Sequence, residues 1–294
     1  MTRAHYALLP DRGVVSVSGE DAAKLLQGII TNDMDLLQKQ PALHTALLTP
    51  QGKILFEFFV AKSGAGYLLD VAASQIADLI KRLAMYKLRA KVDIKDACAD
   101  YRVIAVWGLS PQSHGKASGI VSFIDPRLPD LGTRILAEAA LAADIASATN
   151  AMEATAANYD GHRIALGVPE ITKDYPPSDT FAHEANLDVL KSVSFAKGCF
   201  IGQEVASRME HRGTARTRAV IVESETPLAP AGKITAGDAT IGTIGSTAGT
   251  RAIALVRLDR ADEAQTKSTP ITAGDVAITI RRPGYLESAA VPAR

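Results

Sequence analysis

Short apolar runs and turn residues alternate along the first half of the chain. A β-branched run at residues 14–17 is followed by polar residues that can cap a helix, and the spacing predicts that helix over residues 21–30. Strands are predicted at residues 44–48, 54–60, 67–71, 91–94 and 102–107. A segment that opens at Ser74 has apolar residues at helical spacing. These elements predict an α+β body.

The second half of the chain changes character twice. Residues 137–159 are rich in alanine and carry an apolar stripe that is equally compatible with one helix or two. After Arg216, Ala-Gly turns separate short apolar runs such as residues 219–222 and 252–258. This shift in composition predicts a small closed β domain at residues 217–294, beside an α+β body at residues 1–216.

The composition fits a globular chain with more than one packed unit. The 294 residues are 47% hydrophobic and 22% charged, so they hold enough apolar side chains for several cores. Lys and Arg number 32, as do Asp and Glu, and the net charge of zero provides no overall field that attracts nucleic acid or an anionic membrane. We therefore expect neither a stable nucleic-acid complex nor a membrane partner.

Cysteine usage and the N-terminal sequence indicate a cellular compartment. The two cysteines, Cys98 and Cys199, are too few for a disulfide framework, and the first residues lack the apolar core of a secretion signal. Both features predict the cytoplasm. Carboxylates flank Cys98 in the sequence, at Asp96 and Asp100, so we expect its thiolate to be disfavoured.

One segment, residues 193–213, combines several unusual choices. Gly198 and Gly202 flank residues 199–201, so the backbone there can adopt a positive φ or approach a ligand closely. Residues 203–211 suit a helix, which places Cys199 just before a helix N-terminus. With Lys197 two residues away, that position favours the thiolate. The segment predicts a reactive, accessible thiol at Cys199.

The same segment permits simpler interpretations. Residues 197–218 carry five cations and two anions, and such a basic cluster is usually solvated surface. A lone cysteine is often a small buried apolar side chain. The six histidines show no metal-ligand spacing, and no Ser-His-Asp arrangement follows from the sequence, so we expect no metal site.

Residues 197–204, KGCFIGQE, resemble the K-G-C-Y/F-x-G-Q-E signature of the YgfZ family. Members of that family are related to the glycine-cleavage aminomethyltransferase, or T-protein, and act in the assembly and repair of iron–sulfur clusters. Further motifs follow the family's order at residues 19–21, 26–28, 31–33, 49–53, 162–163, 167–170 and 184–188. The form of the motifs at 162–170 is similar to that of the alphaproteobacterial branch and its mitochondrial counterpart.

The resemblance implies an α+β fold in three domains around a central cavity, with a C-terminal β-barrel. The body would divide into one subdomain of residues 1–42 with 137–216 and another of residues 43–136. The cavity would bind tetrahydrofolate or another folate. The catalytic residues implied are Cys199 and Lys197. The cofactor-binding residues implied are Asn32, Asp33, Tyr159, Arg163, Glu184, Gly198, Gly202, Gln203, Glu204 and Arg208.

Departures from the T-protein pattern bear on the chemistry. A T-protein carries an acid shortly after its glycine turn, and here Glu57 is the acid that could substitute there or else face solvent. A second family acid, which binds the pterin ring, is replaced by Ala165. Loss of that carboxylate removes a charge-assisted hydrogen bond of roughly 1.5–3 kcal/mol. These losses argue against an aminomethyltransferase of the T-protein kind.

The sequence and the resemblance together favour an accessory factor for iron–sulfur protein assembly or repair. Its partners would be a folate-like small molecule and iron–sulfur client or assembly proteins. Two alternatives stay open at this point. One is a tetrahydrofolate-dependent aminomethyl or one-carbon transferase, and the other is a helper of tRNA modification.

Overall fold

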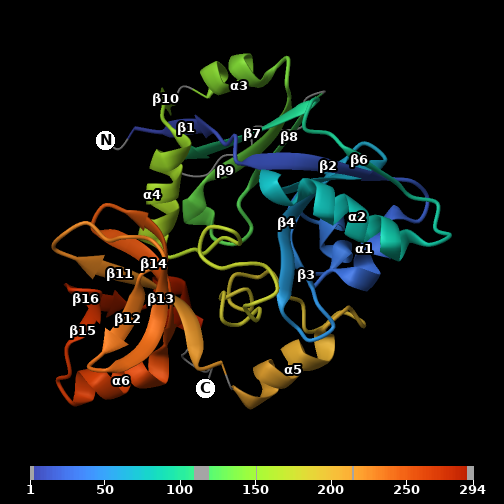
Figure 1. Cartoon of the computed structure of the whole chain (residues 1–294). Helices are drawn as coiled ribbons and strands as arrows, with labels where there is room; N and C mark the ends of the chain where they lie inside the picture. Colours follow the sequence, from blue (N-terminus) through green and yellow to red (C-terminus); the bar gives the residue numbers. More distant parts are fainter. Residues whose placement is uncertain (1–2, 109–118, 150, 214, 290–294) are drawn as a thin grey trace.

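Two five-stranded sheets and a closed barrel carry the β structure of the computed structural model (Figure 1). The structure describes residues 3–108, 119–149, 151–213 and 215–289. The first sheet has the strand order β10–β1–β7–β9–β8, and the second has the order β3–β4–β5–β2–β6. The strands of the first sheet are β1 (His5–Leu8), β7 (Tyr101–Trp107), β8 (Ile120–Ile124), β9 (Thr133–Glu138) and β10 (Met152–Glu153). Those of the second are β2 (Arg12–Ser18), β3 (Ala42–Leu48), β4 (Ile54–Ser63), β5 (Gly66–Ala72) and β6 (Asp93–Asp96).

Helices connect and cover these sheets. The α-helices are α1 (Ala22–Ile29), α2 (Ile76–Lys87), α3 (Ala142–Ala148), α4 (Ala156–Leu166), α5 (Gln203–Arg212), α6 (Leu258–Thr266) and α7 (Gly284–Ala289). Three short 3-10 helices lie at Met34–Gln38, Ala73–Gln75 and Pro129–Leu131. Within the described part of the chain, no helix combines the length and the apolar character that crossing a membrane requires.

The second sheet lies between two layers. On one face, α1 and α2 bury an apolar stripe against it, with Leu26 and Leu79 fully buried. On the other face, Phe59 and Ala61 of β4 pack against Val103 and Phe123 of the first sheet. Since both faces of β4 are covered, seven of its ten residues are buried.

The helix predicted over residues 21–30 is confirmed as α1, which begins after Asp21. The alanine-rich segment forms two helices, α3 and α4, and not one. The Thr155 side chain accepts a hydrogen bond from the backbone N–H of Asn158, whose own side chain accepts one from the Thr155 N–H. This reciprocal cap begins a new helix and explains why the alanine-rich run divides.

The sheets do not follow the subdomain boundaries expected at residues 42 and 136. Strand β2 pairs with β5 and β6, whereas β7, β8 and β9 join β1 and β10. The chain therefore passes from one sheet to the other after β1 and returns after β6. Pairing between strands this far apart in sequence is selected by tertiary packing, which a local hydrophobic pattern does not encode.

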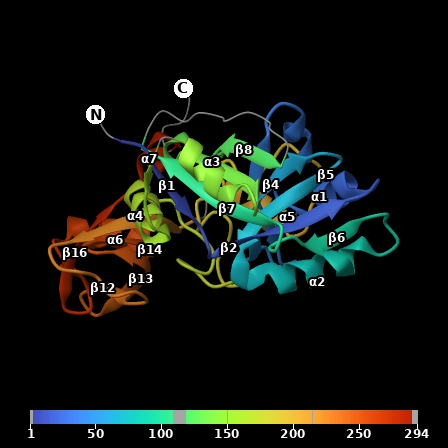
Figure 2. The same ribbon diagram turned by 90° about the horizontal axis from the view of Figure 1, so that it is seen from above.

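The C-terminal β-barrel is confirmed. Its strand order is β11–β14–β13–β12–β15–β16, and its core is apolar. The strands are β11 (Thr217–Ser224), β12 (Lys233–Ala236), β13 (Ala239–Ala248), β14 (Arg251–Arg257), β15 (Ile271–Ala273) and β16 (Val276–Arg281). Figure 2 shows the barrel beside the body, with α4 at the junction. There Ile164 of α4 packs against Ala219 and Ile253 of the barrel.

Buried ion pairs fill the space between the two sheets. Asp70 of β5 accepts hydrogen bonds from Arg12 Nε at 2.7 Å and from Arg134 Nη1 at 2.8 Å. Arg127 pairs with Asp125 at 2.8 Å. The guanidinium carbons of Arg127 and Arg134 lie 4.8 and 4.3 Å from the ring centre of Phe59. These pairs tie the sheets together through charge as well as apolar contact.

Glu57 belongs to this interior and not to the surface, because β4 is covered on both faces. Its side chain contacts the Tyr175 hydroxyl, and its Oε1 lies 3.1 Å from His44 Nε2. Burial alone would raise the pKa of Glu57, but His44 and Arg127 hold it below its usual value. Burial lowers the pKa of His44, and Glu57 offsets only part of that shift. His44 is therefore neutral in the folded protein near pH 7.

We predict that the folded protein loses stability as the pH falls from 6.5 toward 5.5. In that range the unfolded chain binds a proton at His44 that the folded protein does not bind, at a cost of at most about 1.4 kcal/mol per pH unit. His44→Gln should lower stability at pH 7.5 and flatten the slope between pH 7.5 and 5.5 in urea denaturation. The control His211→Gln, at an exposed position, should keep the wild-type slope. An unchanged slope in His44→Gln would refute this assignment.

Candidate functional site

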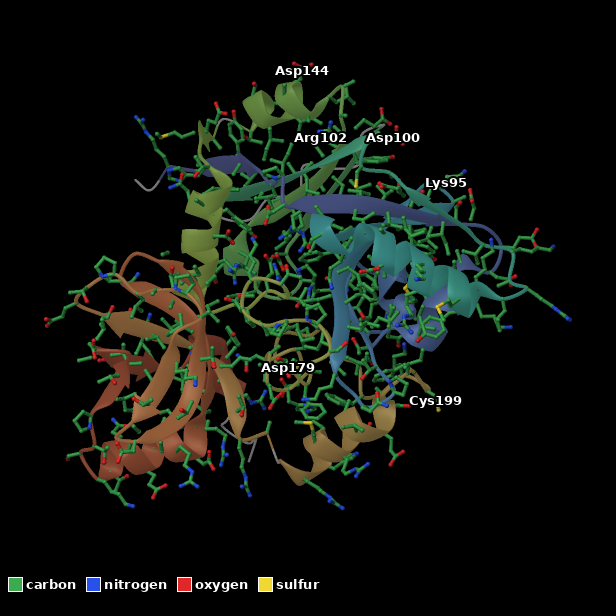
Figure 3. All side chains as sticks on the ribbon, in the orientation of Figure 1. Lys95, Asp100, Arg102, Asp144, Asp179 and Cys199 are labelled. Atoms are coloured by element: carbon green, nitrogen blue, oxygen red, sulfur yellow. The ribbon has the colours of Figure 1, made fainter. Side chains whose placement is uncertain are left out.

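Cys199 lies on an exposed loop just before α5. Figure 3 shows its side chain at the edge of the molecule, pointing away from the body. The other thiol, Cys98, is half-buried, and both cysteines are free. Burial raises the pKa of the Cys98 thiol, and a hydrogen bond with Asp96 raises it further. The sequence-based expectation for Cys98 is thus confirmed, with burial as the larger cause.

Lys197 has its side chain directed inward. Its Nζ donates hydrogen bonds to the backbone carbonyls of Gln27 at 2.7 Å, Ile30 at 2.8 Å and Asn32 at 2.9 Å. Those carbonyls lie at and just beyond the C-terminal end of α1, and Lys197 is 7% exposed. Burial lowers the pKa of this ammonium to about 8. Lys197 therefore contacts the N-terminal part of the chain and not a solvent-filled site.

The glycines of the signature differ in role. Gly202 has φ +79°, and a Cβ on it would lie 2.6 Å from the Thr49 carbonyl oxygen. Gly52, in the turn between β3 and β4, has φ +82°, and a Cβ there would lie 2.8 Å from Val205 Cβ. The turn and the start of α5 therefore fit only with glycine at both positions. A Cβ on Gly198, in contrast, would meet nothing within 4 Å.

Helix α5 extends from this contact along the outside of the body (Figure 1). Its first residue is Gln203, and Ala206 is its buried residue. Glu204 is exposed and pairs with Arg208 at 2.9 Å, an interaction worth little in water. Near the other end, Glu210 Oε2 lies 3.0 Å from His183 Nε2.

The five cations of residues 197–218 do not form one basic surface. They are Lys197, Arg208, Arg212, Arg216 and Arg218. Lys197 is buried, and Arg218 Nη1 donates to both carboxylate oxygens of Asp188 at 2.7 and 2.8 Å. Both charges are therefore engaged in tertiary contacts, which a count of charged residues along the sequence cannot reveal.

The polar turn at residues 31–33 packs against the signature segment. The Asn32 side chain donates to the carbonyls of His44 at 2.7 Å and Lys191 at 2.8 Å. Asp33 accepts hydrogen bonds from the Gln27 side chain and the Asp35 backbone. The structure thus brings Asn32 and Lys197 together, and their polar atoms bind protein groups.

Tyr159, Arg163 and Glu184 contact other parts of the protein. Tyr159 is 3% exposed and packs against Trp107. The Arg163 guanidinium donates to Asp174 at 2.6 Å and to the Val168 carbonyl at 2.7 Å. Glu184 accepts a hydrogen bond from the Phe181 N–H at 2.8 Å, while its own carbonyl accepts one from the barrel. The polar groups of these three side chains therefore have partners within the protein.

Three of the positions that bear on folate binding are Tyr159, Arg163 and Ala165. Tyr159 and Arg163 are buried against protein groups, and Ala165 offers no carboxylate for a pterin. A cavity of about 240 Å³ opens beside Glu170 and Lys173.

Two clusters of side chains could not be predicted from the sequence because their members are far apart in the chain. Ser192 Oγ lies 2.7 Å from His44 Nδ1, whose ring also faces Glu57, but all three side chains are buried and closed to a substrate. Within the described residues, His183, Asp188 and Glu210 bring three possible metal-ligand atoms within 4.8 Å of one another. Arg218 already binds Asp188 there, so a metal ion would compete with a guanidinium.

Two family models match the chain. Residues 216–288 match the CAF17 C-terminal β-barrel domain, and residues 11–122 match the GCVT N-terminal domain. A solved structure of the glycine cleavage system aminomethyltransferase T from Bartonella henselae superposes with a TM-score of 0.77. It covers 97% of this chain and 87% of its own, at 16% identity, and so shows the fold alone.

Curated relatives are iron–sulfur cluster assembly factors by name. The mitochondrial IBA57 homolog of Mycosarcoma maydis is 35% identical over 227 residues, which are 73% of this chain and 56% of the relative. Human mitochondrial IBA57 is 33% identical over 260 residues, which are 80% of this chain and 72% of that protein. The chain spans little more than half the length of the fungal relatives it matches.

The expected cytoplasmic location is contradicted by these relatives, which are mitochondrial by name. Scarce cysteine and the lack of a secretion signal are typical of reducing compartments in general, so they do not distinguish one from another. Taken with the T-protein-like body, the C-terminal barrel and the matched human protein, the comparisons establish the family: this chain belongs to the CAF17/IBA57 family of T-protein-like proteins.

Proposed function

We propose that this protein acts in iron–sulfur cluster assembly by presenting the thiol of Cys199 to a cluster held by a partner protein. The observation that carries the proposal is the exposure of Cys199 on a short span between Lys197 and Phe200, which are both buried. Its relatives are named as iron–sulfur cluster assembly factors, which supports the same conclusion.

The chemistry of one thiol defines what a partner must supply. An iron–sulfur cluster is held by four protein ligands, so Cys199 can provide one of them and a partner must provide the others. Binding replaces the thiol proton with an iron–sulfur bond, and the proton passes to solvent without any change in oxidation state. The partner is therefore an iron–sulfur client or assembly protein with its own ligands, and the cluster is cargo.

A one-carbon transferase is disfavoured by the same geometry. Glu57, the acid that could act on a folate amine, is 2% exposed and contacts Tyr175 and His44. A carboxylate so enclosed is out of reach of an external substrate. Cys199 and the interior network also lie in different parts of the molecule.

Cys199→Ser should abolish the protein's contribution to cluster-dependent enzymes. In cells that lack the endogenous protein, the variant should leave the activities of these enzymes at the level seen without any protein, because a hydroxyl is a poor ligand for iron. Its thermal unfolding should match wild type, since Cys199 is exposed. Cys98→Ser is the matched control and should restore activity. Full restoration by Cys199→Ser would overturn the proposal.

Cys199 should react with iodoacetamide faster than Cys98 in the folded protein. Each unit by which burial raises the pKa of the Cys98 thiol lowers its thiolate fraction about tenfold, and Cys98 is also shielded. Timed labelling at pH 7.5, read by peptide mass spectrometry, should show at least about a tenfold difference in rate. Equal rates in the folded protein would contradict the assignment, and equal rates in urea serve as the control.

We also propose that the chain holds no folate in its interior, since Tyr159 and Arg163, two residues that the resemblance implies for a folate, are buried against protein groups. Isothermal titration of the purified protein with tetrahydrofolate should give no saturable heat. A second titration with Arg163→Ala, which opens space beside Asp174, tests whether packing is the obstacle. Saturable one-to-one binding to the wild-type protein would show that the interior opens to accept the ligand.

A further inference from the structure

The three hydrogen bonds of Lys197 exhaust the donors of its side chain. An ammonium group has three N–H bonds, and here each one has a backbone carbonyl acceptor, at 2.7, 2.8 and 2.9 Å. No N–H remains to stabilise a thiolate or to transfer a proton at Cys199. We propose that Lys197 is a positioning residue that holds the Cys199 loop onto the end of α1. The inference rests on the proposed function only in that the loop is taken to present the Cys199 thiol to a cluster.

The end of α1 suits a cation. The last carbonyls of a helix lack partners within the helix and carry the negative end of its dipole. Lys197 occupies that place from a position more than 160 residues further along the chain. It therefore closes a long-range contact that joins the N-terminal part of the body to the signature segment.

The segment before the cysteine is attached to the same region. The Thr31 hydroxyl donates to the Ser192 carbonyl at 2.8 Å, and the Ser194 N–H donates to the Thr31 carbonyl at 3.0 Å. Together with the Asn32 bond to Lys191, these contacts bind residues 191–197 to the turn at residues 31–33. The turn at residues 31–33 and residues 191–197 therefore form one contact region, which we call the joint.

The segment after the cysteine is fixed as well. Phe200 is 7% exposed, and its ring centre lies 5.3 Å from Lys197 Nζ. Gly202 packs against the Thr49 carbonyl. Gly198 and Cys199 are exposed, whereas Lys197 and Phe200 on either side of them are buried. The thiol is therefore presented on a short span that is anchored at both ends.

Lys197→Met tests the joint, because it keeps the length of the side chain and removes all three donors. Hydrogen–deuterium exchange of residues 198–203 should become at least about tenfold faster, as local opening no longer breaks these bonds. Cluster-dependent enzyme activity in cells should fall although Cys199 is intact. Lys173→Met, which removes another largely buried ammonium, is the control for general destabilisation and should leave exchange of the loop unchanged.

Lys197→Arg separates positioning from charge. A guanidinium keeps the positive charge, but its planar donors cannot converge on three carbonyls as one tetrahedral ammonium does. We expect loop exchange and cellular activity to lie closer to those of Lys197→Met than to wild type. Wild-type behaviour of Lys197→Arg in both measurements, or unchanged loop exchange in Lys197→Met, would overturn the positioning role.

The two proposals fail separately. If Cys199→Ser restores activity in cells while Lys197→Met speeds exchange of the loop, the thiol function is wrong and the joint is right. If Cys199→Ser is inactive while Lys197→Met exchanges and functions as wild type, the thiol function is right and the joint is wrong.

Discussion

Asp70 is the residue on which the body of the molecule depends. It lies on β5 of one sheet and accepts hydrogen bonds from Arg12 on β2 and from Arg134 on β9 of the other sheet. All three side chains are buried, so each charge requires the others. Removing one partner of such a group leaves an unpaired buried charge, which typically costs about 3–5 kcal/mol. The network therefore fixes how the two sheets face each other, which apolar contact alone specifies less sharply.

That interior also decides where chemistry can occur. Here arginines surround the Phe59 ring, and carboxylates pair with them. Some polar atoms there, such as Arg127 Nη1 and Arg134 Nε, are buried without a hydrogen-bond partner. Cys199, the thiol that we propose for cluster chemistry, is exposed outside this interior, just before α5.

The signature illustrates how a conspicuous motif divides into separate physical tasks. Lys197 binds carbonyls, Phe200 fills a core, and Gly202 permits a close backbone contact. Cys199 is exposed between Lys197 and Phe200, which are both buried. In the function that we propose, the buried residues of the motif support the thiol, as neighbours commonly hold a functional group in place.

The sequence by itself determined the mixed body and the C-terminal barrel, and it singled out the segment around Cys199 as a candidate site. Those features depend on local information: apolar periodicity, turn residues and glycines that permit particular backbone angles. Only the tertiary structure decided which strands share a sheet and that Glu57 is buried. It also decided that the charged groups of Lys197 and Arg218 bind partners far away in the sequence. Side-chain partners separated by more than a hundred residues leave no periodic trace in the sequence. Whether a charged residue acts on a ligand or holds the fold is set by which groups meet it after the chain has folded.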